Sequence, residues 1–206
     1  MKKRKLITAV ALVVLVGVSV FSTLAYFTDK ADKTNPFVVG NIDLELNEPT
    51  WDKYTDTKSP DYNPEYNVLV PNKQIAKDPI VTLKAKSEAS YLFVKLENGL
   101  VDANQQSLVS FDIDTKSWLP LSEDPTIYVY SADGLTPAVI SKADADQNFT
   151  FFTQIIVNSD AQTGLAGLGA SAASIHVTAF AHQATIEGQT DAYSSVVVPA
   201  VLAALN

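Results

Sequence analysis

The chain of 206 residues contains no cysteine, and this absence removes several kinds of chemistry at once. Without thiols there is no disulfide framework, no thiolate nucleophile and no cysteine-ligated zinc site. Histidine is scarce as well, since His176 and His182 are the only two. After residue 22, no apolar run is long enough for a membrane-spanning helix. A domain built from this chain must therefore be stabilised by its apolar core, for which 47% hydrophobic residues suffice.

Basic residues are concentrated at the start of the chain. Lys2–Lys5 form a cationic cluster, and the uncharged, apolar segment Leu6–Phe21 follows it. The small-residue junction Ser22–Ala25 comes next and ends in an Ala-x-Ala-like pattern. A positive region, an apolar region and a small-residue end are the three parts of a secretory signal peptide. The sequence therefore predicts an exported protein.

We expect cleavage after Ala25, because Thr23 and Ala25 occupy the two positions at which signal peptidase requires small side chains. Tyr26 would then begin the mature chain. The alternative is that residues 6–22 remain as a membrane anchor, since their length is close to the lower limit for a spanning helix. Export and the lack of cysteine together favour a secreted protein in the extracellular matrix or on the cell surface of a Gram-positive-type bacterium.

Acidic residues dominate the rest of the chain. Without residues 1–25 the chain has 181 residues, with 11 Lys and Arg against 23 Asp and Glu, which gives a net charge of −12. This length corresponds to one domain. An acidic surface argues against binding to nucleic acid or to anionic lipid. Any self-assembly must therefore rely on specific contacts that overcome mutual charge repulsion.

Alternation of apolar and polar residues predicts short β-strands along most of the mature chain. Residues 41–47 alternate strictly, as in a half-buried strand, whereas Tyr91–Glu97 is apolar on both faces, as in a central strand. Residues 50–67 show no period, which indicates a long loop. Residues 192–205 favour a helix that is broken near Pro199. The other expected strands are Val68–Val70, Ile80–Lys86, Ser117–Leu121, Thr126–Tyr130, Phe149–Val157 and Ser174–Glu187.

This pattern of short strands without a long amphipathic helix indicates an all-β protein. We predict an antiparallel, jelly-roll-like β-sandwich with a long loop insertion, preceded by an N-terminal signal helix. The expected organisation is a signal peptide over residues 1–25, an extended N-terminal arm over residues 26–40, and the β-sandwich domain over residues 41–206.

Several stretches resemble the TasA and camelysin family of exported proteins. The most specific is the N-terminal block Ala25-Tyr26-Phe27-Thr28-Asp29, followed by Asn35-x-Phe37-x-x-Gly40-x-Ile42-x-Leu44. Further blocks follow in the family's order: Glu48-Pro49-x-Trp51-Asp52, Val70-Pro71-Asn72 with Lys77-Asp78-Pro79, Tyr91–Leu96, Trp118, Tyr128–Tyr130 and Ala179–Ala184. The resemblance implies that the signal peptide is processed by a dedicated peptidase of the SipW type.

The resemblance also implies a jelly-roll subunit of extracellular fibres, in a biofilm matrix or on the cell surface. In such fibres the mature N-terminal segment of one subunit completes a sheet of the next and builds a head-to-tail homopolymer. Here the donor would be Tyr26–Val39, and its anchors would be Tyr26, Phe27, Phe37 and Val39. The contact is physically sound, because an extended segment can pair with the free backbone groups of a sheet edge. Other matrix components are further candidate partners.

Two non-catalytic alternatives compete with fibre assembly. In the first, residues 26–36 are an unstructured arm and residues 37–46 an ordinary first strand, as is common at chain ends. In the second, the protein is a monomeric surface-adhesion module. The aromatic residues of the long loop would then form a contact surface for a partner or polysaccharide, unless they pack on their own sandwich. These aromatic residues are Trp51, Tyr54, Tyr62 and Tyr66.

Camelysins are described as metallopeptidases, so a camelysin-like secreted metallopeptidase is the enzyme alternative. A zinc protease of the common type needs two histidines four residues apart on a helix, with an adjacent glutamate. His176 and His182 are instead six residues apart on an expected strand, which separates them by about 20 Å. The sequence also lacks a Gly-x-Ser-x-Gly elbow and a phosphate-binding loop. We therefore predict that the protein is not an enzyme and needs no cofactor.

One acidic segment begins like a calcium-binding loop. Asp144, Asp146 and Asn148 follow the spacing of the first three ligands of an EF-hand. Phe149, however, stands where that loop needs glycine, and Ile155 stands where it needs glutamate. These first three residues are the one calcium candidate in the sequence, and otherwise we expect no metal site.

Overall fold

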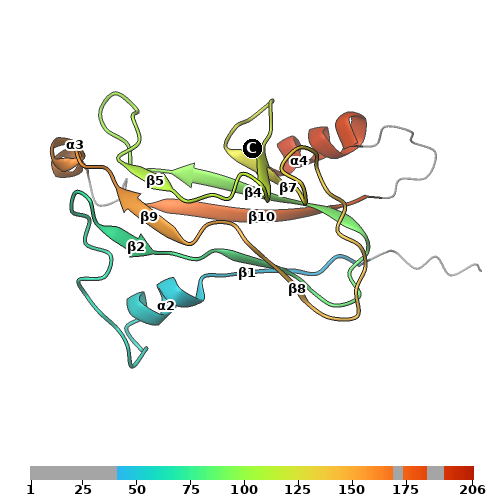
Figure 1. Cartoon of the computed structure of the whole chain (residues 1–206), viewed down its shortest axis with the longest axis horizontal. Helices are drawn as coiled ribbons and strands as arrows, with labels where there is room; N and C mark the ends of the chain where they lie inside the picture. Colours follow the sequence, from blue (N-terminus) through green and yellow to red (C-terminus); the bar gives the residue numbers. More distant parts are fainter. Residues whose placement is uncertain (1–40, 169–173, 185–192) are drawn as a thin grey trace, which may run out of the picture. The chain divides into compact units, whose positions relative to one another are not determined.

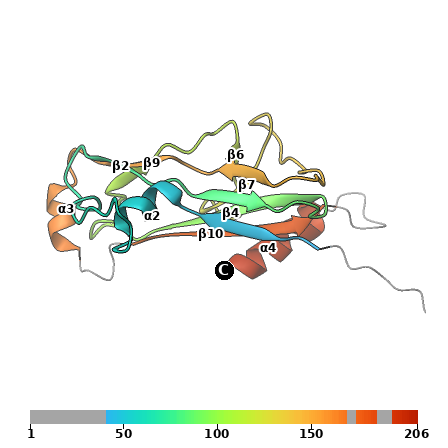
Figure 2. The same ribbon diagram turned by 90° about the horizontal axis from the view of Figure 1, so that it is seen from below.

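A four-stranded antiparallel sheet forms one layer of the fold, in the order β10-β4-β7-β6 (Figure 1 and Figure 2). The computed structural model describes residues 41–168, 174–184 and 193–206. The strands of this first layer are β4 (Ser90–Asn98), β6 (Trp118–Pro120), β7 (Ile127–Tyr130) and β10 (Ile175–Gln183). β10 pairs along its full length with β4, from Ile175 opposite Asn98 to Gln183 opposite Ser90.

The second layer consists of two three-stranded sheets, β1-β3-β8 and β2-β9-β5. Two backbone hydrogen bonds cross the gap between them, from Phe151 to Pro79 (2.9 Å) and from Lys77 to Thr153 (3.1 Å). The two sheets are therefore halves of one bent layer. Its strands are β1 (Leu44–Asn47), β2 (Gln74–Ala76), β3 (Ile80–Leu83), β5 (Val109–Phe111), β8 (Gln147–Thr150) and β9 (Gln154–Val157).

The apolar core lies between the two layers. β4 contributes Leu92, Val94 and Leu96 to it, and β3 contributes Val81 and Leu83. The largest buried side chain nearby belongs to Trp118 of β6. Its ring meets that of Phe151 edge-on at 5.2 Å, and its indole N–H donates to the Thr150 carbonyl at 2.8 Å. The alternation of the sequence thus arises because one face of each strand points into this core.

The outer face of the four-stranded sheet is covered by the C-terminal segment (Figure 2). This segment comprises a π-helical turn, η1 (Tyr193–Val197), and the helix α4 (Val198–Leu205). Phe93 of β4 is fully buried beneath it together with Val197 and Val201. This cover explains why β4 is apolar on both faces, as the sequence predicts. The Lys95 ammonium donates to the Leu205 carbonyl at 2.6 Å and so satisfies the end of α4.

Some predicted elements are wrong in detail. Residues 68–70 are not a strand; the strand of this region is β2. The expected strand over residues 149–157 is two strands, because the chain breaks pairing at the bend. The long loop begins with a helix, α2 (Pro49–Thr55), and a further short helix is α3 (Gln162–Gly167). Pro199 lies in the first turn of α4 and starts that helix instead of breaking it, since a first-turn proline lacks only an amide that has no partner there.

The predicted fold class is confirmed as an antiparallel, all-β sandwich. The jelly-roll-like character lies in pairings between the two halves of the chain, namely β3 with β8, β2 with β9 and β4 with β10. Within the described ranges, no helix has the length and apolarity to cross a membrane. The predicted signal helix and the N-terminal arm lie outside the described residues, as do Thr23, Ala25, Tyr26, Phe27, Phe37 and Val39.

Candidate functional site

The outer edge of β10 is the longest open sheet edge in the described part of the chain. β10 pairs with β4 on one side and with no described strand on the other. Backbone bonds from Gly99 to Ser174 and from Ala184 to Ala89 fix which residues face β4. Since hydrogen-bonded and non-bonded positions alternate in an antiparallel pair, the backbone N–H and C=O groups of the even-numbered residues of β10 point toward β4. The edge N–H and C=O groups therefore belong to Ile175, Val177, Ala179, Ala181 and Gln183, and of these the Gln183 carbonyl already contacts the His182 Nδ1 at 2.9 Å.

The other edges are short or covered. β6 and β5 have three residues each, and β6 ends in Pro120. The edge of β2 is occupied by the loop after α2, because the Tyr66 hydroxyl donates to the Ala76 carbonyl at 2.7 Å. Short edges, proline and loop cover are the usual means by which soluble proteins block edge pairing. β10 has nine residues, without lysine, proline or an acidic side chain, and it lacks these safeguards.

A seam with incomplete apolar cover runs along this open edge. β1 lies close to β10, yet no backbone hydrogen bond joins the two strands among the described residues. Apolar side chains from both strands contact the core but stay only half-buried. They are Leu44 and Leu46 of β1, and Ile175, Val177, Ala179 and Ala181 of β10. An added strand would thus gain both backbone partners and apolar contacts here.

A recess of about 520 Å³ opens at one end of this seam, where β1 ends and α2 begins. Six apolar side chains line it: Trp51, Leu69, Ile75, Leu100, Ile155 and Ile175. The polar lining consists of Glu48, Asn67, Lys77 and Ser174. Mostly apolar walls with a few fixed polar groups are typical of a binding recess.

The segment between β2 and β3 fixes α2 at the rim of this recess. Asp78 accepts hydrogen bonds from the backbone amides of Thr50 (2.8 Å) and Trp51 (3.3 Å), and so caps the start of α2 from a distant part of the chain. The Lys77 ammonium forms an ion pair with the carboxylate of Glu48. It also lies 4.6 Å from the centre of the Trp51 ring, within reach of a cation–π contact.

Lys77 is unusually buried for a lysine, with its side chain only 7% exposed. Of its three ammonium hydrogens, Glu48 accepts one, and no other acceptor is found in the described part of the chain. Burial of an ammonium is unfavourable unless it is paired and hydrogen-bonded. The recess therefore contains a neutral ion pair with spare donor capacity. The sequence analysis missed this pair, although both Glu48 and Lys77 occur in the blocks on which the resemblance rests.

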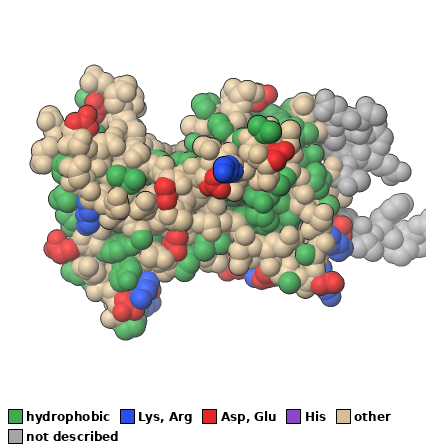
Figure 3. Space-filling model, in the orientation of Figure 1, with side chains coloured by type: hydrophobic (Ala, Val, Ile, Leu, Met, Phe, Trp, Pro, Cys, Tyr) green, Lys and Arg blue, Asp and Glu red, His purple; other side chains and the backbone are tan. Residues whose placement is uncertain are grey.

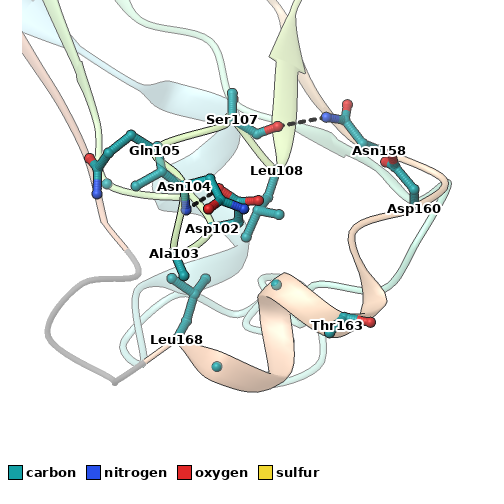
Figure 4. A pocket seen from close by; sticks show the side chains of 14 residues that line it. Asp102, Ala103, Asn104, Gln105, Ser107, Leu108, Asn158, Asp160, Thr163 and Leu168 are labelled. Carbon is teal, nitrogen blue, oxygen red and sulfur yellow. Dashed lines mark hydrogen bonds between the residues drawn. The ribbon is translucent and has the colours of Figure 1, made fainter.

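A second hollow, of about 590 Å³, lies between α3 and the loop after β4 (Figure 4). Its polar side chains hold that loop in place. Asp102 accepts from the amides of Asn104 and Gln106, both at 2.8 Å, and Asn158 donates to the Ser107 carbonyl at 2.9 Å. The Asp102 carboxylate and the Asn158 amide therefore serve to hold the loop, and we assign no chemistry to this hollow.

The calcium candidate is divided among structural contacts. Asp146 pairs with Lys84 at 2.7 Å and accepts from the Ala85 amide, while Asn148 accepts from the Thr82 hydroxyl at 2.8 Å. These bonds tie β8 to β3. The Lys84 hydrogen bond, with the amide of Ala85, lowers the pKa of Asp146. Asp144 is exposed and makes none of these contacts. Over the described ranges, no three His, Asp or Glu side chains are grouped closely enough to hold a metal ion.

The two histidines lie on the outer face of β10, opposite Glu97 and Tyr91 of β4. Their six-residue separation along one strand is as the sequence predicts.

Figure 3 shows acidic and basic side chains scattered singly over one face of the molecule, without an extended patch of one sign. The aromatic residues of the long loop mostly pack on each other, since Tyr54 stacks on Tyr66 at 4.6 Å and Trp51 meets Tyr66 edge-on. Tyr62 alone is largely exposed.

No protein-family model matches the sequence, and no curated protein matches it. Two solved structures show a weak similarity to this chain. Both are reeler domains of human F-spondin, in two crystal structures. The first has 11% identity over 77% of this chain and 88% of that one, with a TM-score of 0.34. The second has 13% identity over 75% and 84%, with a TM-score of 0.29. Likeness at this level carries no conclusion about what the chain does.

Proposed function

We propose that this chain is a secreted structural protein, which assembles into extracellular fibres of a biofilm matrix or cell surface by strand addition. The observation that carries the proposal is the open edge of β10. Its nine residues pair on one side only, and the apolar side chains along it are incompletely covered. An edge of this length, without protective residues, favours pairing with an extended segment.

The donor in this proposal is Tyr26–Val39 of a second copy. Its 14 residues exceed the nine of β10, so the segment is long enough to pair with the whole edge. Its apolar residues Tyr26, Phe27, Phe37 and Val39 would cover the half-buried side chains of the seam. Donor and acceptor surfaces differ, and such a heterologous contact repeats without closing, which produces a filament.

The test of the donor is deletion of residues 26–34 from the mature chain, followed by negative-stain electron microscopy. The full-length mature chain should form filaments, and the deleted chain should remain monomeric with an unchanged circular dichroism spectrum. Filaments of normal abundance from the deleted chain would refute the donor role. Absence of filaments from the intact mature chain, at any concentration tested, would refute fibre assembly as such.

The acceptor edge is tested by Ala179→Pro. The amide of Ala179 faces the free edge, so proline there removes a donor that β4 does not use, and proline is tolerated on such an edge. We expect a folded monomer that no longer assembles. Ala179→Ser keeps the amide and is the matched control, which should form filaments like the unmodified chain. Equal assembly by the two variants would show that β10 is not the acceptor.

A further inference from the structure

The exposed large apolar side chains of the described residues fall into two groups. Tyr62, Val68 and Val70 belong to the loop after α2, beside the recess, and their exposure ranges from 42% to 47%. Leu135 and Val139 follow β7 and are 81% and 47% exposed. The recess lies at the Asn98 end of β4, since Ile175 pairs with Asn98 there. The second group lies at the opposite end, because Ile140 bridges to Ser90.

Leu135 is held out from the surface by a rigid turn. The Asp133 carboxylate accepts from the amides of Leu135 (2.8 Å) and Thr136 (2.9 Å). Gly134 has a φ of +72°, and a side chain at that position would lie 3.0 Å from the Cα of Lys116, so glycine is required. The turn is thus preorganised, and little conformational entropy would be lost if Leu135 were buried in a contact.

The recess provides the complementary hollow. Its six apolar side chains leave about 520 Å³, which is ample for a leucine side chain and part of its turn. Lys77 contributes an under-used ammonium at the wall of this space. Because the ion pair with Glu48 is already neutral, a further carboxylate would leave a buried net charge, whereas a neutral backbone carbonyl would not. The chemistry of the recess therefore matches an apolar turn with free carbonyl groups.

We infer that Leu135 of one copy inserts into the recess of a second copy. This inference rests on the proposed function and adds to it a side-chain contact that is independent of strand addition. An apolar knob and a matching hollow at opposite ends of one molecule produce a heterologous, head-to-tail contact that repeats without closing. The Leu135 end is also where the described chain begins, since Asn41 accepts from the Glu88 amide near Ser90. A donor segment would therefore leave its own domain next to the Asp133–Thr136 turn, which carries Leu135.

Disulfide cross-linking tests this contact, because the natural chain contributes no thiols. Leu135→Cys is combined with Asn67→Cys, since Asn67 is exposed at the wall of the recess. Filaments of the double variant are oxidised and run on non-reducing denaturing gels. We expect a ladder of multimers, with at least tenfold more trimer and higher species than Leu135→Cys alone. The control pairs Leu135→Cys with Ser110→Cys, an exposed position on β5, and should stop at dimers.

The opposite results are equally informative. If filaments form but the Leu135–Asn67 pair gives no ladder above the control, the docking contact is wrong and fibre assembly by strand addition stands. An intrachain disulfide in monomers would likewise overturn it. If the intact mature chain forms no filaments, the proposed function itself fails. As a second measurement, Leu135→Asp should reduce filament mass at least tenfold without changing the urea midpoint, whereas Leu135→Met should assemble normally.

Discussion

Breaking the buried Glu48–Lys77 ion pair beside the recess should lower the free energy of unfolding. Glu48→Gln leaves the Lys77 ammonium without its counter-ion, in a position where its side chain is only 7% exposed. Breaking a buried pair from one side typically destabilises by about 3–5 kcal/mol. Glu48 retains 19% exposure, and Lys77 keeps its contact with the Trp51 ring, so we expect the lower end, about 3 kcal/mol.

The double variant Lys77→Met/Glu48→Gln should be more stable than Glu48→Gln alone. Methionine fills much of the volume of lysine and carries no charge, so no uncompensated ion remains. We expect recovery of at least half of the loss, roughly 1.5 kcal/mol or more. The assay is urea unfolding at pH 7, at a concentration where the mature chain is monomeric by size exclusion.

A loss of about 3 kcal/mol corresponds to a fall in melting temperature of roughly 6–12 °C for a domain of this size. Lys84→Met is the control, because Lys84 forms its ion pairs with Glu45 and Asp146 at the exposed surface. Surface pairs contribute little, so this variant should shift the midpoint far less. Equal losses in Glu48→Gln and the double variant would refute the reasoning, as would a Glu48→Gln variant that unfolds at the wild-type urea concentration.

Three further predictions concern the core, the C-terminal segment that covers the four-stranded sheet, and the turn that carries Leu135. Trp118→Phe should destabilise by roughly 2 kcal/mol in urea, because the buried indole loses its hydrogen bond to the Thr150 carbonyl and the smaller ring leaves a space in the core; a change below about 0.5 kcal/mol would contradict this. Burial, with smaller effects of Glu123 and Tyr91, raises the pKa of the Tyr193 phenol to about 12. The unfolded chain therefore ionises first, and stability should fall as pH rises from about 10 to 12; because burial also raises the pKa of Tyr128 and Tyr66, Tyr193→Phe should reduce this fall without abolishing it. The amides of Thr136 and Leu135 lower the pKa of Asp133 to about 2. The contribution of the Asp133 carboxylate to the free energy of unfolding should be present above the ordinary carboxyl pKa and be lost as pH falls through about 2. An NMR titration of Asp133 with a midpoint near 4 would contradict this.

The ranges of several strands were predictable, because β-branched and aromatic residues bounded by turn residues mark a strand in the local sequence. β4, β7 and β10 lie within a few residues of the expected ranges. β5 was missed, since three residues give too short a pattern. α2 was missed for a different reason: its N-terminal amides are capped by Asp78, which lies more than twenty residues further along the chain. A local pattern cannot report a cap that comes from another element.

The candidate site was less predictable than the strands that form it. Ser174–Glu187 reads as a strand, but its place at the edge depends on which strands pair, and β4 is about 80 residues away in sequence. The pair Glu48–Lys77 joins residues 29 positions apart, and neither side chain has a local signal for burial. Likewise, the side chains of Asp146 and Asn148 look free in the sequence and are bonded to β3 in the fold.

The open edge and the acidic charge have opposite effects, and their combination favours ordered assembly. A long unprotected edge alone promotes indiscriminate pairing. The chain without residues 1–25, however, carries a net charge of −12, and repulsion between acidic copies opposes every contact that lacks specific compensation. Because β10 itself carries no acidic side chain, strand addition there meets less repulsion than contacts elsewhere. Raising the ionic strength should therefore accelerate filament growth by the intact mature chain, since screening removes the general repulsion and leaves the edge contacts in place. Growth that slows with added salt would mean that charge attraction, and not the β10 edge, drives assembly.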